Sequence, residues 1–120
     1  MRVILLSLTL MVAAALAGAA AAHAMLERAS PAVGSRLAAS PREVRLSFSQ
    51  ALVAAFSSFT LTGADGRVVA GRPHVDPSDP TQLVLPLKRP LAPGRYQVKW
   101  RVVSVDTHVT EGDFSFSVGP

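Results

Sequence analysis

Apolar and polar residues alternate in three segments of the chain. In residues 43–49, EVRLSFS, one face consists of Val44, Leu46 and Phe48. In residues 94–104, GRYQVKWRVVS, one face consists of Tyr96, Val98, Trp100 and Val102. In residues 112–118, GDFSFSV, one face consists of Phe114, Phe116 and Val118. A period of two residues predicts β-strands with one buried face. The aromatic rings in these strands are therefore expected in a hydrophobic core, rather than on a surface that stacks against a ligand.

Turn signals divide the remaining sequence. Residues 56–71, FSSFTLTGADGRVVAG, predict a β-hairpin around an Asp65-Gly66 turn. Residues 72–80, RPHVDPSDP, contain three prolines and are expected to form a loop. Residues 81–87, TQLVLPL, predict a short strand that Pro86 restricts to a sheet edge. Residues 49–58, SQALVAAFSS, fit either one helical turn or the entry to a strand.

No segment after residue 22 carries a 3.6-residue period over several turns, so no long helix is predicted. About seven short strands separated by turns, in roughly 100 residues, are typical of an immunoglobulin-like sandwich. The predicted fold class is therefore all-β, a Greek-key β-sandwich of about seven strands.

The first 22 residues have the pattern of a secretory signal peptide. Arg2 precedes an apolar run from Val3 to Leu16, and small residues follow it. The strongly apolar run is followed by alanine and glycine, so it is too short for a transmembrane helix. We expect residues 1–22 to be removed and residues 23–120 to form one exported domain without a membrane span. Cleavage after Ala24 also satisfies the small-residue rule, which leaves the mature start open between His23 and Met25.

Charge and cysteine content narrow the possible functions. Residues 23–120 carry 11 basic and 8 acidic side chains, a formal charge of +3 without any run of like charge, and no cysteine. Such dispersed charge gives little support for nucleic-acid binding. The absence of cysteine excludes disulfides, thiolate metal sites and cysteine nucleophiles, so any metal ligands must be nitrogen and oxygen atoms.

Two of the three histidines, His74 and His108, lie in the interior of the predicted domain, far from its first residue. His74 falls in the predicted loop, two residues before Asp76, and is expected to be exposed and inert. His108 follows Asp106 by two residues in SVDTHVTEGDF, residues 104–114. In an extended chain, side chains two residues apart point to the same side. Asp106 and His108 can therefore present a carboxylate and an imidazole to a metal ion, or they can form a hydrogen-bonded surface pair.

The third histidine gains a second donor if the leader is cut after Ala22. The new α-amine and the imidazole of His23 can then hold one metal ion in a small chelate ring. Together with Asp106 and His108, this residue offers three nitrogens and one oxygen, a set that suits tetragonal Cu(II) better than a closed zinc site.

These segments resemble the CopC family of periplasmic copper-resistance proteins. The resemblance rests on HAMLERASPAVGSRLAASPREVRLSFSQ, residues 23–50, on GADGRVV, residues 63–69, and on LAPGRYQVKWRVVSVDTHVTEGDFSFSV, residues 91–118. It implies a cupredoxin-like or immunoglobulin-like sandwich in the periplasm that binds one Cu(II) per mature chain. The ligand positions that it implies are His23, Asp106 and His108. It also implies a role in copper resistance or homeostasis, with a CopD-type inner-membrane transporter as partner.

The chain departs from the family pattern at two positions. Some members use a glutamate of the second strand at the Cu(II) site, and here that position is Gln50, a weak ligand that we leave out of the site. Other members carry a methionine-rich loop for Cu(I). Met25 is the one methionine after residue 22, so no Cu(I) site is expected and Met25 is expected to pack against the domain.

Two other functions remain open alongside a non-enzymatic copper carrier. Copper monooxygenases that attack polysaccharides also use an N-terminal histidine chelate on a β-sandwich. The small domain, the lack of a flat aromatic platform and the carboxylate of Asp106 argue against this activity. A β-sandwich interaction module that binds no metal is the other alternative.

Overall fold

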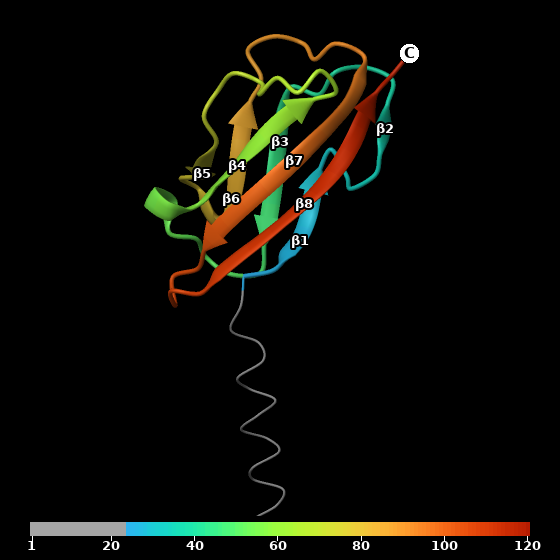
Figure 1. Ribbon diagram of the computed structural model, residues 1–120. Helices are drawn as coiled ribbons and strands as arrows, with labels where there is room; N and C mark the ends of the chain where they lie inside the picture. Colours follow the sequence, from blue (N-terminus) through green and yellow to red (C-terminus); the bar gives the residue numbers. More distant parts are fainter. Residues whose placement is uncertain (1–23) are drawn as a thin grey trace, which may run out of the picture.

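The computed structural model describes residues 24–120, which form two four-stranded sheets (Figure 1). The first sheet has the order β1-β3-β6-β5 and consists of β1 (Leu26–Ser30), β3 (Glu43–Phe48), β6 (Asp79–Pro86) and β5 (His74–Asp76). The second has the order β2-β8-β7-β4 and consists of β2 (Arg36–Leu37), β8 (Val109–Val118), β7 (Gly94–Val103) and β4 (Ser58–Gly63). Every pairing is antiparallel except β2 with β8. The predicted all-β sandwich is confirmed. It has eight strands instead of about seven, since β2 and β5 are too short to show an alternating pattern in the sequence.

The core lies between the sheets and is built from the alternating positions of the strands. Val44, Leu46 and Phe48 of β3 are at most 2% exposed, and they belong to one buried cluster with residues of β7 and β8. Phe114 and Phe116 of β8 are also buried, which confirms the core assignment of these rings. Trp100 is only partly buried, and its ring meets Phe48 edge to face at a centroid distance of 5.2 Å.

The predicted loop at residues 72–80 is wrong. His74–Asp76 forms the edge strand β5, and β6 begins at Asp79. Val75 packs against the core, so burial outweighs the low strand propensity of the flanking prolines. The expectation that Pro86 marks an edge strand is also wrong, because β6 lies between β3 and β5. Pro86 is the last residue of β6, where the ladder ends.

The predicted turn at Asp65-Gly66 is present, but its second arm is shorter than expected. Gly66 has φ +81° and its N–H donates to the carbonyl of Gly63 at 3.0 Å. Beyond the turn, a single bridge joins Thr62 and Val68, so β4 has no full-length hairpin partner. The ambiguous segment at residues 49–58 contains one turn of 3-10 helix, Ala54–Phe56.

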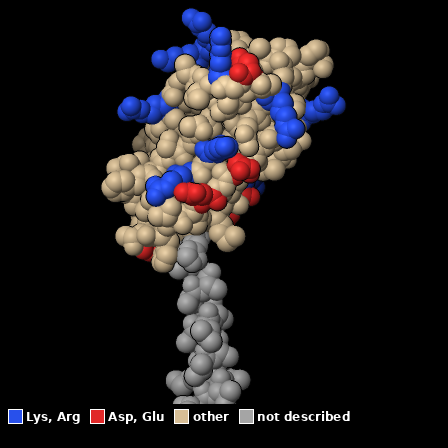
Figure 2. Space-filling model, viewed as in Figure 1, with Lys and Arg blue, Asp and Glu red and all other residues tan. Residues whose placement is uncertain are grey.

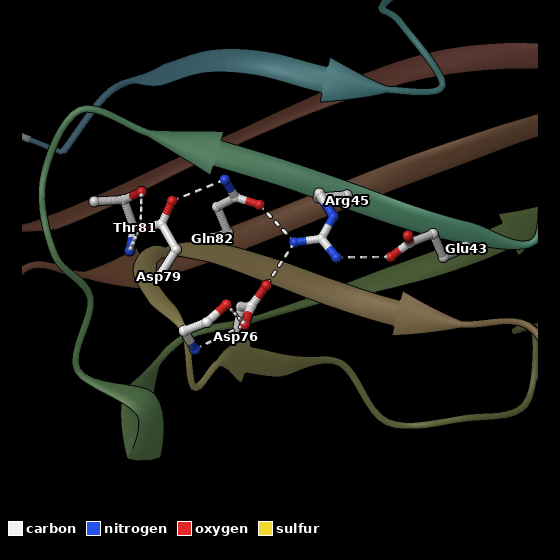
Figure 3. Close-up of polar contacts among 7 residues, drawn as sticks. Glu43, Arg45, Asp76, Asp79, Thr81 and Gln82 are labelled. Atoms are coloured by element: carbon white, nitrogen blue, oxygen red, sulfur yellow. Dashed lines mark hydrogen bonds and ion pairs between the residues drawn. The ribbon is translucent and has the colours of Figure 1, made fainter.

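A polar network on the outer face of the first sheet joins β3, β5 and β6 (Figure 3). Arg45 of β3 donates to Asp76 of β5 at 2.8 Å and to Gln82 of β6 at 2.5 Å, and it pairs with Glu43 at 3.2 Å. The hydrogen bond from Arg45, together with those from Ser78, lowers the pKa of the Asp76 carboxyl to about 2. This network fastens the short edge strand, which has few backbone hydrogen bonds of its own.

Replacing Asp76 by asparagine is expected to lower the melting temperature at neutral pH by more than it does near pH 2. The folded state holds the pKa of this carboxyl below its ordinary value of 3.8, so the ionised form stabilises the fold above 3.8. That stabilisation is lost as the pH falls from 3.8 towards about 2. Thermal unfolding of both proteins across this range measures the difference. Asp113→Asn, which removes an exposed carboxylate from β8, is the control, and a gap that does not narrow with acid for Asp76→Asn would contradict the prediction.

The two ends of the sandwich are made by different loops. The turn between β7 and β8 and the chain entering β1 lie at one end, at the bottom of Figure 1. The loops that follow β4 and β6 lie at the opposite end (Figure 1). Within residues 24–120, no helix is long and apolar enough to cross a membrane.

Candidate metal centre

Asp106 and His108 lie in the tight turn that joins β7 to β8. The N–H of Ser104 donates to the carbonyl of His108 at 3.0 Å, and the N–H of Thr107 donates to the carbonyl of Ser104 at 2.8 Å. Thr107 adopts the left-handed region, with φ +71°. The segment is therefore a turn, and the expectation of an extended chain at Asp106 and His108 is wrong. The turn itself brings the two side chains to the same side.

The two side chains meet at the solvent surface. Oδ2 of Asp106 lies 3.3 Å from Nδ1 of His108, and their side chains are 37% and 48% exposed. Two donors that each lie about 2.0 to 2.1 Å from one metal ion would be separated by roughly 3 Å. The observed separation fits shared binding of one ion. It also fits the alternative of a hydrogen-bonded pair.

Ser104 orients the carboxylate of Asp106. Its side chain is fully buried, and its hydroxyl donates a very short hydrogen bond to Oδ1 of Asp106. This hydrogen bond, followed by the contact with His108, lowers the pKa of the Asp106 carboxyl. Asp106 is therefore an oriented anion that leaves Oδ2 directed towards the imidazole. Sequence reasoning missed Ser104, although a hydroxyl residue two positions before a carboxylate is a common local hydrogen-bonding pattern.

The start of the described chain is held against the same end of the sandwich. Ala24 is fully buried, and its carbonyl accepts a hydrogen bond of 2.7 Å from Oγ1 of Thr110, two residues after His108. Met25 exchanges two further hydrogen bonds with Ser49, at 2.8 and 2.9 Å. These contacts fix the backbone that enters β1 beside the first residues of β8.

His23, the remaining predicted ligand, lies outside the described residues. Within residues 24–120, no group of three or more histidine, aspartate or glutamate side chains is placed to hold a metal ion. Asp106 and His108 thus supply two donors, and a site with more protein ligands needs donors from outside this range.

The other candidate residues do not join this pair. His74 is exposed on the edge strand β5 of the first sheet, and the carboxylate of its neighbour Asp76 is engaged by Arg45 and Ser78. Met25 is 65% exposed, so the expectation that it packs against the domain is wrong. The backbone of Met25 is fixed by two hydrogen bonds with Ser49, and its side chain is exposed to solvent.

Comparison with known proteins identifies the family. A family model described as the CopC domain matches residues 26–119. Protein YobA of Escherichia coli (strain K12) is 39% identical over 98 residues, covering 81% of this chain and 79% of YobA. Copper resistance protein C of Xanthomonas campestris pv. juglandis is 38% identical over 115 residues, covering 90% of each chain. The crystal structure of CopC from Methylosinus trichosporium OB3b is similar with a TM-score of 0.75 and 37% identity, covering 82% of this chain and 95% of that one.

These matches extend over nearly all of the two sheets, and the relatives are covered over most of their own length. They confirm the resemblance drawn from the sequence, and they support a function connected with copper. The chain belongs to the CopC family.

Proposed function

We propose that the mature protein is a non-enzymatic periplasmic carrier that binds one Cu(II) through His23, Asp106 and His108. In this proposal residues 1–22 are a signal peptide, and residues 23–120 are the copper-binding domain. Copper is the cargo of the protein. The exported chain sequesters it or carries it, in copper resistance or homeostasis.

The observation that carries the proposal is the hydrogen bond between Thr110 and the carbonyl of Ala24. This bond holds Ala24, the residue that follows His23, against Thr110, which is two residues after His108 in the chain. One peptide bond separates Ala24 from the predicted chelating residue. The amine and imidazole of His23 are therefore available to complete the pair of donors that Asp106 and His108 present.

The chemistry of the donors favours Cu(II). Two imidazoles, one amine and one carboxylate are borderline and hard ligands, and imidazole with oxygen in a tetragonal arrangement suits Cu(II). A site for Cu(I) would need several soft ligands. Residues 24–120 contain no cysteine and one methionine, which supports the choice of oxidation state.

The proposed role in the cell is supported by the family. The name of the relative from Xanthomonas describes a copper resistance protein. A CopD-type inner-membrane transporter is proposed as the partner that exchanges copper with this domain. The turn with Asp106 and His108 is exposed, so a partner has direct access to the bound ion.

Two observations favour a carrier over a copper monooxygenase. Phe56, 65% exposed, is the one aromatic residue in residues 24–120 that is mostly exposed, whereas polysaccharide binding needs a flat group of rings. In the proposed site the carboxylate of Asp106 would also fill a coordination position that an oxidant needs open.

The test is the intact mass of the exported protein before and after one equivalent of Cu(II). We expect a chain that begins at His23 and gains one copper. His108→Ala and Asp106→Asn should lose this tightly bound copper, because each removes a ligand. His74→Ala is the matched control, since it removes an exposed histidine from the other sheet, and it should keep the full stoichiometry.

Two results would contradict the proposal. Copper binding that is unchanged in His108→Ala would exclude the site as described. A mature chain that begins at Met25 and binds no copper would favour an interaction module instead, because His23 would be discarded with the leader.

A further inference from the structure

Seven basic side chains gather at the end of the sandwich opposite the turn with Asp106 and His108. We call this region the basic end, and it consists of Arg36, Arg42, Arg67, Arg72, Lys88, Arg89 and Arg95. Lys and Arg side chains crowd the upper part of the space-filling view, whereas Asp and Glu lie mostly in its lower half (Figure 2). This grouping is not visible along the chain, because these residues are dispersed over 60 positions.

The strand topology explains why they converge. Arg95 lies at the start of β7, next to Gly94, which pairs with Val118 at the end of β8. Arg36 pairs with Ser117 at that same end of β8. The other five basic residues lie in the segment before β3, in the loop that follows β4 and in the loop that follows β6. All of these segments meet at one end of the sandwich (Figure 1).

The charge is strongly divided between the two ends. The basic end has seven basic side chains and two acidic ones, Glu43 and Asp65, which is a formal charge of +5. The remainder of residues 24–120 has four basic and six acidic side chains, a formal charge of −2. The overall charge of +3 therefore conceals a molecule with a pronounced dipole.

The basic side chains are exposed and mostly lack acidic partners. All seven belong to residues that are exposed to solvent. Among the described residues, Arg67 is the one member of the basic end with an ion pair, to Asp65 at 3.8 Å. In contrast, Arg45 and Arg101 elsewhere in the domain are neutralised by nearby carboxylates. The positive charge of the basic end is thus available to an external anion.

We infer that the basic end binds a surface of anionic phospholipid headgroups. Exposed arginines and lysines on several separate loops match a broad, two-dimensional array of phosphates, and each contributes to attraction at such a surface. A nucleic acid is the less suitable polyanion, because single-strand recognition uses exposed rings for base stacking. The aromatic ring beside these loops, Tyr96, is 8% exposed, and its hydroxyl donates to the carbonyl of Ala92.

Attachment of this kind is peripheral and reversible, and no segment enters the lipid. In the attached state the turn with Asp106 and His108 faces away from the membrane, so exchange of copper with an inner-membrane partner takes place after the protein detaches. The protein is thereby concentrated at the membrane while its opposite end stays accessible. The basic end contains no proposed copper ligand, so lipid binding does not depend on the proposed function.

The test is co-sedimentation of the mature protein with vesicles. We expect binding to phosphatidylethanolamine vesicles that contain phosphatidylglycerol, and none to phosphatidylcholine alone. The triple variant Arg72→Gln, Lys88→Gln, Arg89→Gln should lower the partition coefficient by roughly tenfold to a hundredfold at low salt. Raising the ionic strength from about 0.01 M to about 0.15 M should weaken wild-type binding as the Debye length shortens from about 30 Å to about 8 Å.

A charge-matched variant separates location from net charge. Arg28→Gln, Lys99→Gln, Arg101→Gln removes the same three charges from exposed positions outside the basic end. It should retain most of the vesicle binding, and His108→Ala should retain all of it. Equal loss of binding in both triple variants would overturn the inference, as would the absence of binding to anionic vesicles. Tighter binding to single-stranded DNA than to these vesicles would overturn the lipid assignment. Thermal unfolding verifies that both triple variants are folded.

Discussion

Replacing His23 by alanine, in a chain that begins at residue 23, is expected to lower the affinity for Cu(II) at least about a hundredfold. The substitution keeps the α-amine but removes the imidazole, so the small chelate ring can no longer form. Changes to groups that merely orient metal ligands cost about 10- to 100-fold, and the loss of a direct ligand should cost more. Competition titration against a chelator of known affinity measures the effect.

The fold provides a control for this substitution. Ala24, with its hydrogen bond to Thr110, and the two bonds between Met25 and Ser49 are retained, so the metal-free variant should unfold at the wild-type temperature. Acetylation of the amine in the chain with His23 intact is the complementary change, and it should also weaken copper binding. An affinity within about threefold of wild type in both proteins would mean that residue 23 is not a ligand, since loss of a ligand costs far more.

The sequence predicts the strands that have a long alternating pattern, and it fails where tertiary contacts decide. β3, β7 and β8 are recognisable because one face of each is buried or half-buried along its length. The short strand β5 is hidden among prolines and aspartates, and it is stabilised by Val75 in the core and by Arg45 on the outer face. Neither contact is visible from local composition.

The candidate site divides in the same way. The proximity of Asp106 and His108 was predicted from their spacing, although the turn that produces it differs from the extended chain assumed. The roles of Ser104 and Thr110 were not predicted, because they depend on how the turn folds and on which segment lies beside β8. The placement of His23 stays a prediction, since it lies outside the described residues.

The basic end could not be predicted from the sequence for a different reason. Net charge and charge runs describe the order of residues along the chain, whereas the topology of the two sheets decides which residues lie together on the surface. The arginines and lysines of five separate segments lie at one end only once β7, β8 and β6 have paired. A chain without runs of like charge can therefore still present a strongly charged surface.

Gly112 of β8 is where we expect the largest loss of stability from adding a single methyl group. It pairs directly with Trp100 in the ladder between β7 and β8. A Cβ atom at this position would lie 2.4 Å from one carbon of the Trp100 indole and 2.7 Å from another. The indole cannot move freely, because its ring also contacts Phe48 edge to face. Gly112→Ala should therefore destabilise the fold by about 1–3 kcal/mol, the usual cost of overpacking.

A double-mutant cycle distinguishes this clash from a general effect on the strand. In a domain of this size, each kcal/mol corresponds to about 4–8 °C in melting temperature. Trp100→Leu alone removes part of the core, but it also vacates the space beside Gly112. Gly112→Ala should then cost little in the Trp100→Leu background, which gives a coupling energy of at least about 1 kcal/mol. If Gly112→Ala has the same effect in both backgrounds, the glycine is required by the backbone and not by the indole that packs over it.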